Sequence, residues 1–200
     1  MDKPDVIRGR IIQEASALFF STGYSHVLMS ELAQRLGMSK KTLYLYFASK
    51  EELLQVVIKE YQQEIQSEVE RLLKDETQAF PDKINQIFGF VATKLYTVSP
   101  TFVKDVKKHA PKGWALVQAY KADAAFIRFN TLLNEGVRQG YVRQDVNRPL
   151  AVLLYASALE SILNPDFTQQ VPEDLMQELP LKPASVFDGL LNIIFHGILM

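Results

Sequence analysis

The stretch "LGMSKKTLYLYFASKEEL", residues 36–53, decides the fold because it places a glycine turn between two helical segments. Gly37 can adopt the positive φ of a tight turn, and Ser39 can cap the helix that follows. Ser49 with Glu52 three residues later forms a capping box, which predicts the start of a long helix. The stretch therefore predicts a helix, a turn, a second helix and a third, longer one.

The residues before this stretch continue the helical pattern. Apolar side chains recur with the helical period from Ile7 to Phe19, which predicts a first helix over residues 5–22. Gly23 would end that helix in a left-handed cap, and Ser30 is expected to cap the next one. Together they predict a three-helix head at the amino terminus.

Every signal after residue 53 is also helical. Four prolines stand where a first helical turn tolerates proline, each before a periodic segment: Pro81, Pro100, Pro111 and Pro149. The helix from Pro111 is expected to end at Gly140. Residues 164–183 are expected to form a loop or a broken helical excursion, and residues 184–200 are expected to form a last amphipathic helix. The expected fold is all-α, with the head followed by a helical bundle. Its domains would be residues 1–50 and 51–200, with a connecting helix over 51–75.

Composition excludes several kinds of protein. The chain of 200 residues is 48% hydrophobic and 22% charged, which is ordinary globular composition. It has no cysteine, and its histidines at 26, 109 and 196 are too scattered for local metal-ligand spacing, so neither a metal nor a cofactor is expected. The start "MDKPDVIRGR" lacks the apolar core of a signal peptide, and no uncharged run approaches the roughly 20 residues of a membrane span. These features predict a cytoplasmic protein.

Charge is unevenly distributed. The net charge is only −1, but residues 1–50 hold seven Lys/Arg against four acids, a net of +3, whereas residues 51–200 carry −4. A protein that coats nucleic acid through general basicity is excluded, so any such contact must come from a local patch.

The second helix of the helix-turn-helix carries polar groups that a core does not require. Leu32, Leu36, Met38, Leu43 and Phe47 would pack inward. The outward groups are amines, hydroxyls and phenols, from Lys40, Lys41, Thr42, Tyr44 and Tyr46. Such a helix can enter the major groove, reading base edges with some groups and anchoring on phosphates with others.

The segment "MSELAQRLGMSKKTLYLYFASKEELL" resembles the DNA-binding region of the TetR family of bacterial transcriptional regulators, and "IIQEASALFFSTGYSHVLMSELA" extends the likeness through the first helix. The family's characteristic run is present as Thr42, Leu43, Tyr44, Tyr46, Phe47, Ser49, Lys50 and Glu51. The resemblance implies base contacts from Lys40, Lys41 and Thr42, and phosphate contacts from Tyr44, Tyr46, Lys50 and Ser30. Ser39, at the start of the second helix of the helix-turn-helix (the reading helix), completes the set of candidate DNA-binding residues.

The resemblance also implies a partner and a ligand. Two heads on a palindromic DNA operator need a homodimer, which the last two helices would form; residues 150–163 and 184–200 are apolar on more than one face. The alternative for these faces is an internal core. A small-molecule inducer would sit among the aromatics of residues 80–140, with candidates Tyr96, Phe102, His109, Trp114 and Tyr120. These aromatics could equally be ordinary core.

The function expected is a sequence-specific DNA-binding regulator, a repressor that a small apolar ligand releases. The resemblance implies that helix shifts in the bundle would move the fourth helix, the connecting helix, and so change the spacing of the two heads. Two other classes stay open. One is a helical adaptor whose basic helix serves an acidic protein, and the other is an enzyme built on Asp105 and His109.

Overall fold

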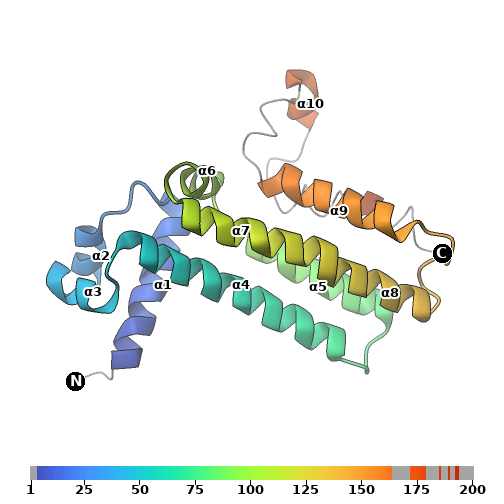
Figure 1. Cartoon of the computed structure of the whole chain (residues 1–200), viewed down its shortest axis with the longest axis horizontal. Helices are drawn as coiled ribbons and strands as arrows, with labels where there is room; N and C mark the ends of the chain where they lie inside the picture. Colours follow the sequence, from blue (N-terminus) through green and yellow to red (C-terminus); the bar gives the residue numbers. More distant parts are fainter. Residues whose placement is uncertain (1–3, 164–171, 179–184, 186–188, 190–191, 194–200) are drawn as a thin grey trace. The chain divides into compact units, whose positions relative to one another are not determined.

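The computed structural model describes residues 4–163, 172–178, 185, 189 and 192–193 (Figure 1). Its elements within these residues are all helical, which confirms the all-α fold. They are α1 (Pro4–Thr22), α2 (Met29–Arg35), α3 (Lys40–Tyr46), α4 (Lys50–Lys74), α5 (Phe80–Tyr96), α6 (Pro100–His109), α7 (Pro111–Asp123), η1 (Ala124–Phe129), α8 (Asn130–Arg138), α9 (Arg148–Leu163) and α10 (Glu173–Glu178). Among the described residues, no helix combines the length and the apolar character that crossing a membrane requires.

The helices form two compact units. Unit 1 comprises Met1–Gln63 and Thr97–Val117, and unit 2 comprises Glu64–Tyr96 and Gln118–Met200. Helices α4 and α7 each contribute one end to unit 1 and the other to unit 2. Helix α6, more than fifty residues after α3 in the chain, therefore belongs with the amino-terminal helices.

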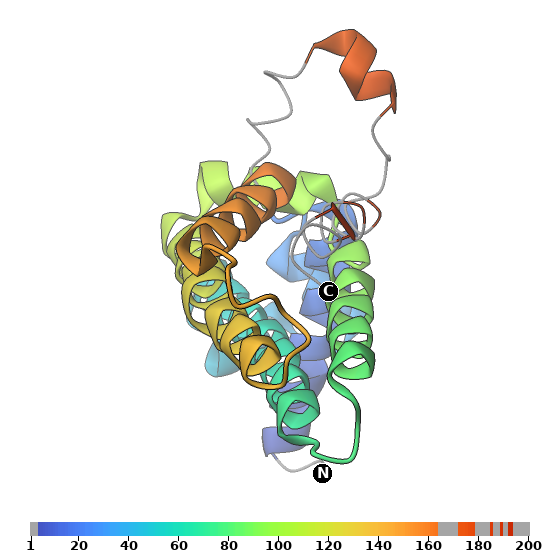
Figure 2. The ribbon, with the colours of Figure 1, turned by 90° about the vertical axis from the view of Figure 1, so that its right-hand side faces the viewer.

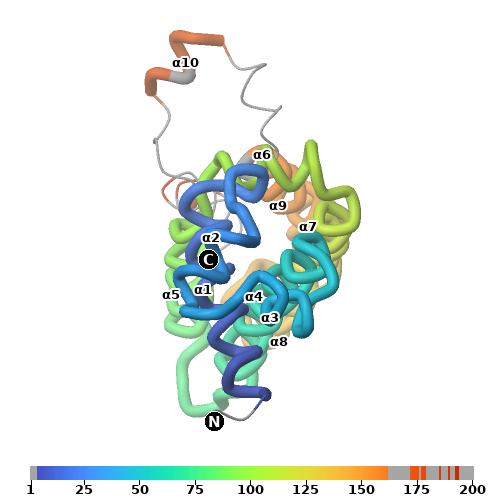
Figure 3. The backbone as a smooth tube through the Cα atoms, turned by 90° about the vertical axis from the view of Figure 1, so that its left-hand side faces the viewer, coloured from blue at the N-terminus to red at the C-terminus, as the bar shows by residue number. Residues whose placement is uncertain are grey.

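Unit 1 is built on one apolar core. Figure 3 shows α2 and α3 beside α1, and α2 and α3 make close backbone contacts with each other. Leu32, Leu43 and Phe47 are at most 1% exposed, so the inward positions expected on the helix-turn-helix are confirmed, with Leu36 and Met38 half-buried at its edge. Burial of a side chain such as Phe47 is worth about 1.5–3 kcal/mol, which holds the short α3 in place.

The turns follow the expected chemistry. Gly23, Gly37 and Gly140 all have positive φ, at 96°, 67° and 79°, as their places after helices predict. At the start of α4 the Glu52 amide donates to Ser49 Oγ (3.0 Å), and the Glu52 carboxylate accepts from the Ala48 amide (2.7 Å). The capping box is thus confirmed, with its carboxylate bonded one residue earlier than the standard pattern.

The expected cap of the second helix is wrong. Leu28, not Ser30, is the N-cap residue of α2, and its side chain caps nothing. The helix begins early because Met29 is buried in the core of unit 1, which brings Ser30 inside the first turn. Its side chain is left exposed at the start of α2.

Unit 2 contains α5, α8, α9 and the ends of α4 and α7. Helices α7, η1 and α8 run without interruption from Pro111 to Arg138, as expected, although the six residues of η1 widen into a π-helix that the sequence pattern does not announce. The Tyr155 ring of α9 stacks on the Phe129 ring (centroids 4.1 Å apart) and meets the Phe88 ring edge-on (6.4 Å). Figure 2 shows α8 and α9 side by side.

Helix α9 is apolar on two faces. One face is buried and includes Ala151, Val152 and Tyr155. The opposite face exposes Leu150, Leu153 and Leu154, each more than half accessible. Helix α10 agrees with a broken helical excursion between residues 164 and 183. The expected last helix over residues 184–200 lies almost wholly outside the described residues.

Candidate nucleic-acid interface

A side-chain cap at its start and two buried side chains on its inner face fix the position of helix α3. At its start the Thr42 amide donates to Ser39 Oγ (3.0 Å), and the two hydroxyl oxygens lie 2.8 Å apart. Leu43 and Phe47, four residues apart, anchor the inner face in the core. The opposite face is therefore fixed toward solvent.

That outer face gathers the predicted cations and a phenol. Lys40, Lys41 and Tyr44 are exposed, and the Lys40 ammonium lies 5.9 Å from the centre of the Tyr44 ring. Thr42 and Tyr46, which lie one helical turn apart on the same side of α3, are half-buried. Leu45, which the sequence reasoning did not single out, is 78% exposed beside them.

The electrostatic balance on this face is positive. Glu14 of α1 and Glu31 of α2 are both paired with Arg35, at 3.5 Å and 3.3 Å. Within the described part of the chain, Lys40 and Lys41 take part in no ion pair closer than 4 Å. Their charges are thus available to an anionic partner.

Lys50 lies at the start of α4 and is more enclosed than the lysines of α3. Its ammonium donates to the Ser25 carbonyl oxygen (3.3 Å) and sits 4.4 Å from the centre of the Tyr24 ring. Burial lowers the pKa of Lys50, and the negative field of Asp105 opposes that shift. No local pattern in the sequence indicates these partners, because Ser25 lies 25 residues from Lys50 in the chain.

The five candidate ligand residues are divided between the two units. Phe102 is buried in unit 1, His109 is exposed at the end of α6, and Trp114 is half-buried there, with the Lys107 ammonium 5.8 Å from its ring. Tyr96 and Tyr120 belong to unit 2.

The two ligand candidates of unit 2 differ in exposure. Tyr96 is mostly exposed, whereas the Tyr120 hydroxyl accepts from Arg128 Nη1 (3.2 Å). Burial raises the pKa of Tyr120, and the hydrogen bond and positive charge of Arg128 oppose the shift. Ligand binding by any of the five stays a prediction.

Comparisons with known proteins bear on the whole chain. Residues 11–57 match the family model described as bacterial regulatory proteins, tetR family. An uncharacterised HTH-type transcriptional regulator of Bacillus subtilis, YvaF, is 25% identical over 194 residues, which span 94% of each chain. A TetR-family regulator from Agrobacterium tumefaciens has a similar fold (TM-score 0.73, 15% identity, 99% of this chain and 100% of that one).

A third similarity is to a solved complex. The structure of SmeT with triclosan aligns with a TM-score of 0.67 at 15% identity, over 98% of this chain and 92% of that one. The match at the helix-turn-helix, the full-length relative and the shared all-α fold agree with the cationic face of α3. Residues 11–57 are thus similar to the amino-terminal domain of the TetR family of bacterial regulatory proteins, and the chain as a whole has the fold of TetR-family regulators.

Proposed function

We propose that the chain represses transcription by binding a palindromic DNA operator as a homodimer, with α3 in the major groove, and that a small apolar ligand releases it. The observation that carries the proposal is the outer face of α3. It presents Lys40, Lys41 and Tyr44 to solvent while Leu43 and Phe47 hold the helix from below. In this proposal Lys40, Lys41 and Thr42 reach base edges.

Phosphate contacts complete the interface. Ser30 is exposed in the first turn of α2, and Ser39 and Tyr46 flank α3. Lys50 and Tyr44 would anchor on the backbone, which positions the reading helix without selecting a sequence. The DNA-binding domain of this proposal is residues 1–50, and residues 51–200 serve ligand binding and dimerisation.

The outward leucines of α9 support the homodimer. Leu150, Leu153 and Leu154 fall on one helical face and are 61%, 54% and 54% exposed. A stripe of this kind, open to water, is the type of surface that a second copy buries. The second dimer helix proposed from the sequence, residues 184–200, lies mainly beyond the described residues.

The proposal of a ligand rests on the similarity to TetR-family regulators and on the many aromatic residues between positions 80 and 140. SmeT, which shares the fold, was solved in complex with triclosan. We extend ligand release to this chain by analogy. A cytoplasmic location belongs to the same proposal, because the operator lies there.

The test is selection of duplexes from a random pool, followed by binding measurements at several salt concentrations. We expect one palindrome to emerge, with log Kd changing steeply with log salt. Lys50→Ala should weaken all sequences alike and lower the salt slope by about 2 for a dimer, whereas Thr42→Ala should change base preference. Lys59→Ala is the matched control, since Lys59 is exposed on α4 outside the interface.

The competing classes predict other outcomes. An adaptor for acidic proteins would select no duplex sequence from the pool. We propose no catalytic role, because the Asp105 carboxylate, which an enzyme would use to orient His109, accepts two hydrogen bonds from Ser25. Recovery of random sequences with salt-insensitive binding would reject the regulator and favour the adaptor.

A further inference from the structure

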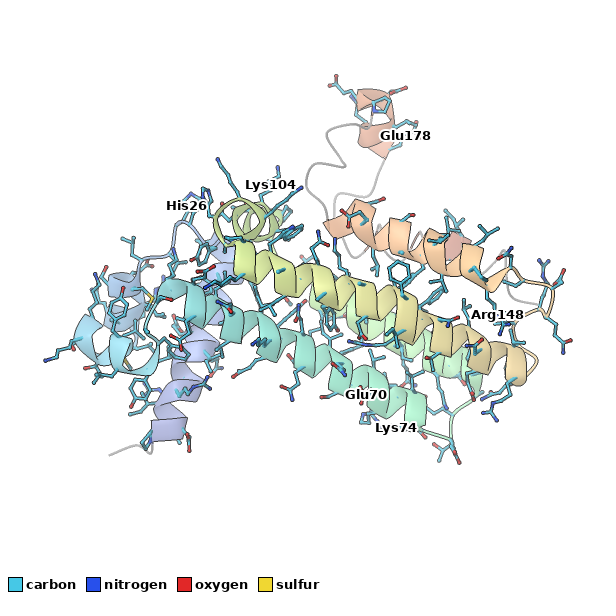
Figure 4. All side chains as sticks on the ribbon, in the orientation of Figure 1. His26, Glu70, Lys74, Lys104, Arg148 and Glu178 are labelled. Atoms are coloured by element: carbon cyan, nitrogen blue, oxygen red, sulfur yellow. The ribbon has the colours of Figure 1, made fainter. Side chains whose placement is uncertain are left out.

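The loop between α1 and α2 is bonded to α6. The Ser25 amide and the Ser25 hydroxyl both donate to Asp105 Oδ2, at 2.9 Å and 2.6 Å. Figure 4 labels His26 on this loop and Lys104, the neighbour of Asp105, on α6. All these residues belong to unit 1, so a carboxylate from the middle of the chain holds a loop of the reading head.

The same serine is bonded to the predicted phosphate contact. The Ser25 carbonyl oxygen accepts from the Lys50 ammonium at 3.3 Å, and the Tyr24 ring lies under that ammonium. Ser25 therefore links Asp105 on one side with Lys50 on the other. Because Lys50 has a long flexible stem, these partners restrict where its charge can be placed.

Helix α6 is seated firmly enough to act through this link. The Phe102 ring meets the Phe20 ring edge-on (centroids 4.9 Å apart), and the Ser99 amide donates to the Phe20 carbonyl oxygen (3.0 Å). Val106 and Ala110 are buried in the same core. A shift of α6 would thus carry Asp105 with it.

The loop between α1 and α2 packs closely against α6. A Cβ at Gly23 would come within 2.8 Å of Asp105 Oδ2 and 2.9 Å of Thr101 Cγ2. The Asp105 side chain is 14% exposed, and His26 Nδ1 lies 3.7 Å from its Oδ2. Burial pushes the pKa of Asp105 up, but the bonds from Ser25 and the fields of His26 and His109 outweigh it, so the pKa lies below its usual value. Asp105 is therefore ionised at neutral pH.

We propose that Asp105 is a positioning residue for operator binding, which through Ser25 holds Lys50 where it can reach a DNA phosphate. Displacement of α6 by a ligand would break the two bonds to Ser25 and withdraw that support. The inference rests on the proposed function and adds to it a route by which α6 controls the head. Asp105 itself touches no DNA in this scheme.

The first test needs no DNA. Amide hydrogen exchange of the full-length protein is measured for Asp105→Ala, Asp105→Asn and the control Lys108→Ala, which changes an exposed residue of the same helix. We expect the Ser25 amide and its loop to exchange at least about tenfold faster in Asp105→Ala, as loss of a bond to a charged acceptor implies. Asp105→Asn should lie close to the wild type, because one side-chain oxygen accepts both Ser25 bonds. Equal exchange in Asp105→Ala and Lys108→Ala would overturn the tether.

The second test measures affinity for the selected operator in a double-mutant cycle with Lys50→Ala. Asp105→Ala should weaken binding about tenfold in the wild-type background, without altering base preference, and less than about twofold when Lys50 is already alanine. Asp105→Asn should restore most of the loss, because its side-chain oxygen can accept both bonds from Ser25. A full, additive loss in the Lys50→Ala background would refute the positioning role while leaving DNA binding intact. A wild-type chain that selects no duplex would instead refute the proposed function.

Discussion

Gly136 in α8 makes a sharp test of how unit 2 is packed. A Cβ built there would lie 2.5 Å from Val142 Cγ2 and 2.6 Å from Phe80 Cζ, distances that real Cβ atoms essentially never show. Val142 and Phe80 are each 1% exposed, so neither side chain can move aside into solvent. Overpacking of this kind costs about 1–3 kcal/mol, and the better helix propensity of alanine returns at most about 1 kcal/mol. We expect Gly136→Ala to lower the free energy of unfolding by about 1–2 kcal/mol.

Gly89 in α5 is the matched control within the same unit. It is exposed, and a Cβ there would meet nothing within 4 Å. Gly89→Ala should therefore raise the free energy of unfolding by about 0.5–1 kcal/mol, through helix propensity alone. Urea denaturation followed by circular dichroism, at one fixed protein concentration because association adds to stability, measures both changes. Shifts of the same sign in the two variants would show that the packing around Gly136 is not as tight as described.

Three further predictions address the surfaces. Leu153→Glu, which puts a charge on the exposed stripe of α9, should convert a dimer to monomers in sedimentation experiments; an unchanged dimer would place the interface elsewhere. Leu45 is an apolar side chain on the outer face of α3 and could contact a thymine methyl group. Replacing one operator thymine by uracil removes that methyl group, which should lower the affinity of the wild type about three- to fivefold. The same replacement should hardly change the affinity of Leu45→Ala. Equal losses in the two proteins would exclude that contact. Because the folded pKa of Asp105 is lowered, its ionised form contributes stability above about pH 4 and loses it at more acidic pH. The stability advantage of wild type over Asp105→Ala should therefore shrink on acidification in urea titrations, and a constant advantage would contradict the assigned bonds.

Local chemistry explains which parts of the head were predictable from sequence. Gly23 and Gly37 have positive φ, and Ser39 and Ser49 cap helices, because each signal lies within three or four residues of its effect. The start of α2 was misplaced because Met29 is drawn into the core, and tertiary burial overrides a capping preference.

The candidate site was predictable only where it is local. The residues of α3 share one helix, so periodicity alone separates Leu43 from its outward neighbours. The link between Ser25 and Asp105 depends on how α6 packs in unit 1, and no periodic or capping signal spans eighty residues. The π-helical turn of η1 was likewise not predictable from the sequence, because it shifts the register of buried residues such as Ala125 and Phe129 without changing their type.

The membership of α6 in unit 1 affects how the protein can be dissected. A fragment that stops at Gln63 would lose Phe102, Val106 and Ala110 from the core of unit 1, and would uncover the side of the Phe20 ring that Phe102 contacts. A reading head transplanted onto a foreign sensor must therefore bring residues 97–117 with it. Chimeras that are joined to the foreign sensor at one point in α4 should be insoluble. Chimeras that are joined in both α4 and α7, the two helices that are divided between the units, should fold.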